Sequence, residues 1–88
     1  MDTNRLQPGD IVQHFKGNMY QILTFGTHSE TEELVVIYQQ LYWPYNFFVR
    51  PYDMFMSEVD KVKYPDTKQK YRFEKIKIEH NESKNSFR

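Results

Sequence analysis

Apolar residues in this chain fall in short runs broken by polar residues, with the two-residue alternation of β-strands along several of them. The most apolar run, Leu34 to Tyr38, is rich in β-branched residues, which favour strands. It is apolar on both faces. We therefore expect a central strand, or a barrel strand whose outer face is covered.

Two strands are predicted before this run, over residues 11–16 and 19–25. Gly17-Asn18 between them fits a two-residue type II′ hairpin turn. That turn would pair Lys16 with Met19 and Gln13 with Ile22. The predicted core face would then hold Ile11, Phe15, Tyr20 and Ile22, and the opposite face Val12, His14, Lys16, Gln21 and Leu23.

The remaining elements follow from turn residues and from further alternation. Gly26 predicts a bulge or bend, residues 28–33 a turn, and residues 42–46 a loop around Pro44. A fourth strand is expected at 47–50. Pro51 then suits the start of one helical turn over 52–56. Last come a short strand at 58–63, a turn at 64–67 and a closing strand at 71–78, whose alternation slips after Phe73.

This order predicts an all-β fold, a small SH3-like barrel of five to six short strands with one helical turn. The alternatives are an OB-like barrel and an open α+β roll. With 88 residues, the chain is expected to form one domain over residues 1–78. Residues 79–88 are expected to be a polar, disordered tail.

Composition narrows the class of protein. The chain has no cysteine, which excludes a disulfide framework and a Cys-based zinc site. No apolar run approaches the roughly 20 residues that a membrane span needs. The first residues lack the layout of a secretory signal. We therefore expect a cytoplasmic protein that does not contact a membrane.

Charge is balanced over the whole chain but unevenly placed. Residues 1–60 hold three basic and eight acidic residues, whereas residues 61–78 hold seven basic and two acidic ones. The two parts could neutralise each other, or the basic segment could meet an anion. Nucleic-acid-binding domains are usually basic overall, which disfavours that partner here.

Aromatic residues are unusually frequent, with seven Tyr, seven Phe and one Trp. A core this small is not expected to bury all of them, so some should form an exposed binding surface. The predicted ligand groove lies in and after the loop and consists of Tyr42, Trp43, Tyr45 and Tyr52. The alternative is that these rings only cover one end of the barrel.

Polar residues suggest a second patch at the barrel mouth. Its members are His14, Lys16, His28, Glu30 and Arg50. They would supply positive charge, hydrogen bonds or proton transfer. Alternatively, Arg50 pairs with Glu30 or Glu33 and pins the acidic turn to the barrel. No nucleophile elbow, phosphate-cradling glycine loop or HExxH motif occurs, and the spacing of His14 and His28 does not indicate a metal site. We expect no catalytic residues, metal or cofactor.

Several segments together resemble a known family. They are His14 to Tyr20, His28 to Thr31 with Glu33, Val36 with Tyr38, Leu41-Tyr42, Val49-Arg50-Pro51, Met54-Phe55 and Arg72-Phe73. The chain resembles the small bacterial proteins known as domain of unknown function 1653. The resemblance implies an SH3-like fold and no established activity. Phe48 stands where that family usually has Trp, and residues 74–88 extend past its usual end.

Three functions remain open from the sequence. The first is a non-catalytic binding module for a peptide or protein partner. The second is a nucleic-acid or nucleotide binder. The third is a small enzyme using His14, His28 and Glu30. The oligomeric state is left open.

Overall fold

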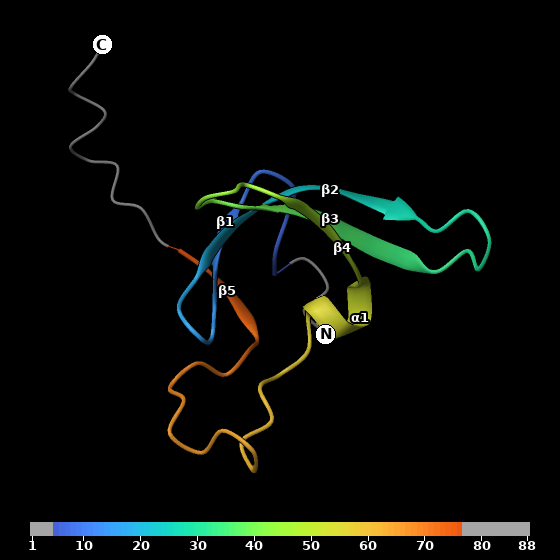
Figure 1. Ribbon diagram of the computed structural model, residues 1–88. Helices are drawn as coiled ribbons and strands as arrows, with labels where there is room; N and C mark the ends of the chain where they lie inside the picture. The colour runs from blue at the N-terminus through green and yellow to red at the C-terminus, as the bar shows by residue number, and fades with distance from the viewer. Residues whose placement is uncertain (1–4, 77–88) are drawn as a thin grey trace.

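Five strands pair in one antiparallel sheet in the order β4-β3-β2-β1-β5 (Figure 1). The structure, a computed structural model, describes residues 5–76. Its elements are β1 (Ile11–His14), β2 (Met19–Thr27), β3 (Leu34–Gln40), β4 (Phe47–Pro51), the one-turn helix α1 (Tyr52–Phe55) and β5 (Phe73–Lys75). The predictions of an all-β, barrel-like fold and of a helical turn after Pro51 are confirmed.

The sheet is strongly curved, and α1 lies on its concave side (Figure 1). β3 is central, between β2 and β4, and Val36 on it is fully buried. The rings of Phe55 from α1 and Phe73 from β5 stack with centroids 4.0 Å apart. The core of buried residues consists of Leu6, Val12, Ile22, Val36, Tyr38, Phe55 and Phe73.

The segment before β1 belongs to this core. Leu6 is fully buried. The guanidinium of Arg5 donates hydrogen bonds to the carbonyl oxygens of Phe73, at 2.8 Å, and Met56, at 3.2 Å. These contacts tie the N-terminal segment to β5 and to the end of α1.

The predicted register of the first hairpin is wrong. Gln13 faces Met19 rather than Ile22, and Val12 faces Tyr20. Gly17 is the reason, because it has a positive φ of 113° and donates its N–H to the carbonyl of His14 at 2.7 Å. This is the geometry of a three-residue loop in which glycine ends the turn. As a result, Val12 and His14 join Tyr20 and Ile22 on the core face.

Two further local predictions are corrected. The bulge in β2 lies between Ile22 and Thr24, while Gly26 continues the strand opposite Val35. Residues 58–63 form no strand apart from a single bridge between Glu58 and Tyr71. There, the carboxylate of Asp60 accepts hydrogen bonds from the backbone N–H groups of Val62 and Lys63, which closes a turn instead.

The turn at residues 64–67 is confirmed, and the last strand is shorter than predicted. β5 pairs with β1, with Phe73 opposite His14. Residues 77 and 78 and the predicted tail at 79–88 lie outside the described residues. No helix in the described part of the chain is long and apolar enough to cross a membrane.

Candidate functional site

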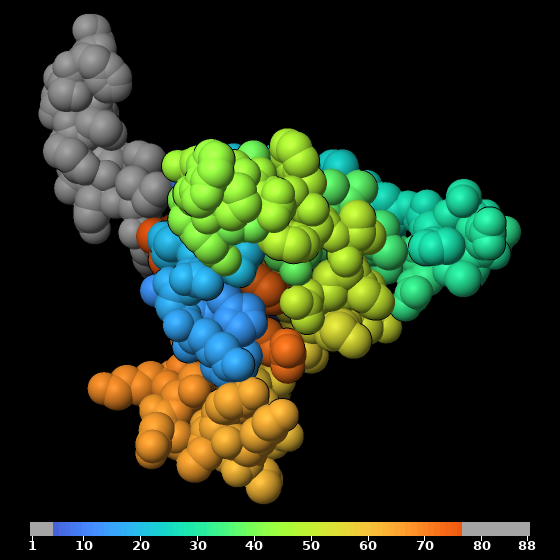
Figure 2. Space-filling model, viewed as in Figure 1, coloured from blue at the N-terminus to red at the C-terminus, as the bar shows by residue number. Residues whose placement is uncertain are grey.

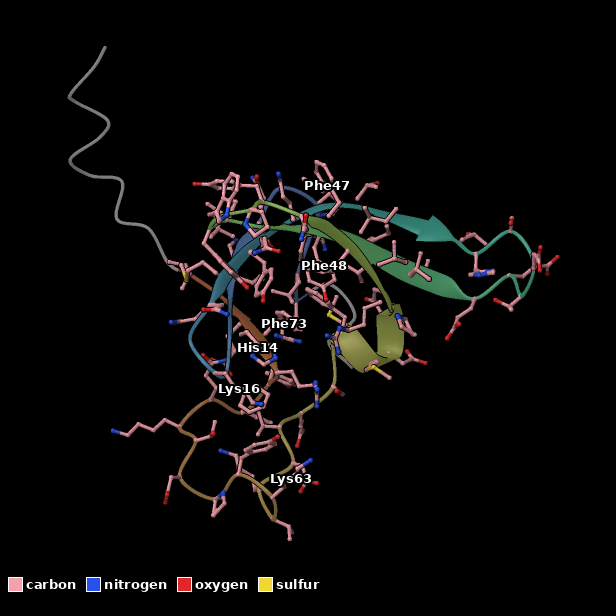
Figure 3. The ribbon with its side chains drawn as sticks, in the orientation of Figure 1. His14, Lys16, Phe47, Phe48, Lys63 and Phe73 are labelled. Atoms are coloured by element: carbon pink, nitrogen blue, oxygen red, sulfur yellow. The ribbon has the colours of Figure 1, made fainter. Side chains whose placement is uncertain are left out.

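The concave face of the sheet carries a group of aromatic rings around Tyr38. Antiparallel pairs place opposite residues on one face, so Tyr38 shares this face with Ile22 on β2 and Phe48 on β4. The Tyr38 ring lies 5.5 Å from the ring of Tyr20 and 5.7 Å from those of Phe48 and Phe73. Figure 3 shows Phe48 and Phe73 on this inner side of the curved sheet, whereas Phe47 is on the outer side.

Tyr20 and Tyr42 form a hydrogen-bonded pair beside this group of rings. The hydroxyl oxygens of Tyr20 and Tyr42 are 2.9 Å apart, and the side-chain amide of Asn18 donates to the Tyr42 hydroxyl at 3.1 Å. Burial, followed by the hydrogen bond with Tyr42, raises the pKa of Tyr20 to about 12. The Tyr20 phenol is therefore neutral near pH 7 and acts as a hydrogen-bonding group.

Positive charges gather beside these rings. The Arg50 guanidinium lies 5.8 Å from the centre of the Phe73 ring, and the His14 ring packs edge-on against the same ring at 4.9 Å. His14 also stacks on Phe15 at 4.5 Å. The guanidinium of Arg72 and the ammonium of Lys16 lie 5.7 and 5.9 Å from the centre of that second ring. Arg50 and His14 therefore lie beside the Phe73 ring, and Arg72 and Lys16 lie with His14 beside the Phe15 ring.

His14 is uncharged in this setting. Its pKa falls from the ordinary 6.5 to about 4, first because of burial and then because of the positive charges of Arg72, Arg50 and Lys16. Its Nδ1 accepts a hydrogen bond from the backbone N–H of Lys16 at 3.1 Å. The neutral ring therefore carries its proton on Nε2, where it is a hydrogen-bond donor.

The predicted polar patch is only partly assembled. His14, Lys16 and Arg50 come together, but His28 and Glu30 lie in the loop between β2 and β3, at the far end of an extended arm (Figure 1). There, Nδ1 of His28 accepts the backbone N–H of Glu30 at 3.1 Å. The arm extends away because β2, despite its bulge between Ile22 and Thr24, continues to Thr27. The structure does not assemble the catalytic trio of His14, His28 and Glu30.

The predicted aromatic groove is also divided. The exposed fraction is 80% for Trp43 and 51% for Tyr45, in the loop before β4. Tyr42 instead joins Tyr20 at the concave face, and the ring of Tyr52 packs against that of Phe25 at 5.5 Å. Trp43 and Tyr45 therefore form an outer surface distinct from the polar patch.

That outer surface continues along β4. The side chains of Phe47 and Val49 are 65% and 63% exposed. Both lie on the face opposite Phe48 and Arg50, because side chains alternate along a strand. Among residues 5–76, β4 has one strand partner, β3, so its other edge is open. We call Trp43, Tyr45, Phe47 and Val49 the outer aromatic edge.

Comparison with known proteins identifies the family of the chain. Residues 10–75 match the sequence profile of a family described as protein of unknown function (DUF1653). The chain belongs to the DUF1653 family. It is similar to the crystal structure of a DUF1653 protein from Bordetella bronchiseptica, with a TM-score of 0.67 and 26% identity over 88% of this chain and 99% of that one. A search of curated proteins gave no significant match.

Several residues in and beside this group of rings in the DUF1653 domain were not among the predicted site residues. They are Phe15, Asn18, Tyr20, Tyr38, Phe48, Arg72 and Phe73. Arg72 and Phe73 could have been found from the resemblance of this Arg-Phe pair to the end of the family sequence. The strand that Phe73 begins, β5, pairs with β1, which lies about sixty residues earlier in the chain, and local sequence patterns do not reveal such a pairing. No group of three or more His, Cys, Asp or Glu in residues 5–76 is arranged to hold a metal ion.

Proposed function

We propose that this domain is a non-catalytic binding module that receives an extended segment of a protein partner along the open edge of β4. The observation that carries the proposal is the outer aromatic edge. Phe47 and Val49 are mostly exposed on a strand that has a free edge in the described part of the chain. Exposed apolar side chains on an unpaired strand edge favour the addition of another strand.

The backbone of β4 is oriented for such an addition. The N–H of Gln40 donates to the carbonyl of Asn46 at 3.0 Å, and hydrogen-bonded pairs alternate along an antiparallel ladder. Residues 48 and 50 therefore bond to β3, while the N–H and C=O groups of Phe47 and Val49 point outward. Pro51, which has no N–H, ends this donor series. An incoming strand would find four backbone groups at Phe47 and Val49.

The loop before β4 would supply the specificity. Trp43 and Tyr45 are exposed within a few residues of the edge, and tryptophan is among the residues most enriched at binding hot spots. An added strand would also place alternate side chains on the inner side, beside Phe48 and Arg50. The partner segment we propose is therefore extended, with apolar residues at every second position and no proline within the paired stretch.

Two other functions have less support. The enzyme hypothesis needs His14, His28 and Glu30 together, and they lie at different ends of β2. A nucleic-acid partner would use the exposed rings for stacking, but the formal net charge of the chain is zero. The Coulomb attraction that supplies most non-specific nucleic-acid binding is therefore small.

The test is a selection of random peptides from a display library on the immobilised full-length chain. Recovered peptides are then titrated in solution, with the fluorescence of Trp43, the one tryptophan in the sequence, as the signal. We expect a consensus of alternating apolar residues. The decisive variant is Val49→Pro, which removes one outward N–H donor from the edge strand, where proline is tolerated.

Val49→Thr is the matched control because it keeps both the N–H and the branched side chain. We expect Val49→Pro to abolish peptide binding and Val49→Thr to retain most of it. Equal binding by the two variants would show that the edge is not paired. Failure to select any peptide would overturn the proposal. So would sedimentation showing that the chain forms dimers with itself. Binding of single-stranded oligonucleotides with a steep salt dependence would favour the nucleic-acid function instead.

A further inference from the structure

A second site lies on the concave face and does not depend on the outer aromatic edge. Figure 2 shows the surface hollowed between the β1–β2 hairpin and the chain of β4 and α1, with orange atoms of the segment around β5 between them. Figure 3 shows Phe73 and His14 close together on this side, with Lys16 toward the tip of the hairpin. From β4, the guanidinium of Arg50 lies 5.8 Å from the centre of the Phe73 ring.

Within residues 5–76, no ion pair joins these basic side chains to a carboxylate. Among the described residues, the side chain of Arg50 bonds to the Tyr38 hydroxyl and the Met54 sulfur, and that of Lys16 contacts the rings of Phe15 and Tyr64. The ion pair found within residues 5–76 joins Lys75 to Asp10. The carboxylate of Glu74 is occupied by the backbone N–H groups of Lys70 and Tyr71.

Arg72 is the strongest indication of a ligand. Its Nε–H is buried and has no hydrogen-bond partner in the described part of the chain. Native structures satisfy nearly all buried donors, so one left unpaired needs an explanation. The backbone of Arg72 is fixed on both sides, since its carbonyl accepts from Phe15 at 2.9 Å and its N–H donates to Ser57 at 3.0 Å. These bonds fix the backbone at Arg72, and its guanidinium lies 5.7 Å from the centre of the Phe15 ring with the Nε–H unpaired.

We propose that Arg50, Arg72, Lys16 and His14 bind the phosphate group of a phosphate monoester. Three positive charges and the Nε2–H of neutral His14 present donors only. Two guanidinium forks and an ammonium from different directions suit the three terminal oxygens and double negative charge of such a group. The esterified part would lie along the rings of Tyr20, Tyr42 and Phe48. No covalent step takes place at this site.

The experiment is an NMR titration of the full-length chain, followed through the ring signals of His14. The probes are inorganic phosphate, ribose 5-phosphate, adenosine 5′-monophosphate and adenosine. Free His14 titrates at about 4 under the influence of burial and of Arg72, Arg50 and Lys16. A bound dianion favours the imidazolium, so saturating phosphate ester should raise the pKa of His14 by more than about one unit. Adenosine should leave it unchanged.

Variants separate a built site from general attraction. Arg72→Gln and Lys16→Ala should each weaken binding of the phosphate esters by about tenfold, the scale of one lost charge-assisted contact. Lys16 is exposed, so its variant stays informative even if Arg72→Gln fails to fold. Lys75→Ala is the matched control because it removes an exposed lysine on the same strand as Phe73, and it should bind normally.

Three results would overturn the proposal. The first is the lack of a saturable shift of His14 with any phosphate probe up to ~10 mM, the range of very weak binding. The second is an equal loss of affinity in Lys75→Ala and Lys16→Ala, which would indicate a general effect of net charge. The third is binding of adenosine as tight as that of its monophosphate, which would assign recognition to the rings. Comparing inorganic phosphate, ribose 5-phosphate and the nucleotide identifies which source of phosphate fits.

Discussion

The Nε–H of Arg50 donates a hydrogen bond to the hydroxyl of Tyr38, 3.0 Å away across the β3–β4 pair. The structural alternative predicted from the sequence was that Arg50 pairs with Glu30 or Glu33 in the acidic turn. That turn lies at the end of the arm, so Arg50 reaches instead over a buried ring at the centre of the sheet. Another nitrogen of the guanidinium donates to the sulfur of Met54 at 3.7 Å, and the group lies 5.8 Å from the centre of the Phe73 ring.

Replacing Arg50 with alanine measures this contact. We expect the free energy of unfolding to fall by roughly 1–2 kcal/mol, the scale of a partly exposed hydrogen bond that involves one charged group. Tyr38→Phe should cost a similar amount, and the double variant should cost less than the sum. Urea denaturation of the four proteins gives the values. A loss from Arg50→Ala well above ~3 kcal/mol would assign Arg50 a structural role and remove it from the proposed phosphate site.

Val36 tests the central position of β3. Its side chain is fully buried, so Val36→Asp places an unpaired carboxylate in the core and should unfold the domain. Val49→Asp is the matched control, because Val49 lies on the neighbouring strand with 63% of its side chain exposed. It should keep a cooperative melt close to the parent temperature. A folded Val36→Asp would show that β3 is not central.

The elements best predicted from the sequence are those with strong local causes. The β-branched residues of β3 and the proline before α1 act on their own neighbours, and both elements occur where they were expected. The hairpin register failed because it depends on the position of one glycine in the loop. Gln13 faces a residue three positions from the predicted one, and an odd shift turns every side chain of β1 to the other face. Val12 and His14 were therefore assigned outward.

The candidate site was harder to predict because it brings together residues that lie far apart in the chain. Lys16 and Arg50 were identified as positive charges, but the site also depends on Arg72, which reaches His14 only through the pairing of β5 with β1. The sequence also predicted a bulge or bend at Gly26, just before His28 and Glu30. The strand continues instead, since Gly26 pairs with Val35.

His14 should make stability depend on pH. Its pKa in the folded chain is about 4, below the ordinary 6.5, so the unfolded chain binds more protons between these values. The stabilisation is complete above about pH 6.5 and is lost as the pH falls toward 4, by at most about 1.4 kcal/mol for each pH unit. His14→Gln should reduce this slope. Denaturation at pH 4.5, 5.5 and 7 gives the comparison, and identical slopes in the two proteins would contradict the assigned pKa.

Trp43 provides the clearest separation of binding from stability. The sequence predicted an exposed indole outside the strand alternation, and the exposed fraction of 80% confirms that position. Its role in binding remains a prediction. Trp43→Ala should leave the melting temperature nearly unchanged, whereas Phe55→Ala, which empties a fully buried position, should cost about 3–5 kcal/mol. Fluorescence of the parent should be red-shifted and readily quenched by iodide.

The same variant tests the outer aromatic edge. Peptides selected on the parent should lose their affinity for Trp43→Ala, because a large exposed ring beside a strand edge supplies contact area that alanine cannot replace. Phosphate esters should still bind it normally, since the concave face does not include Trp43. Loss of both activities would show that the two surfaces form one site. Full retention of peptide binding would remove Trp43 from the interface and leave the edge of β4 to act without it.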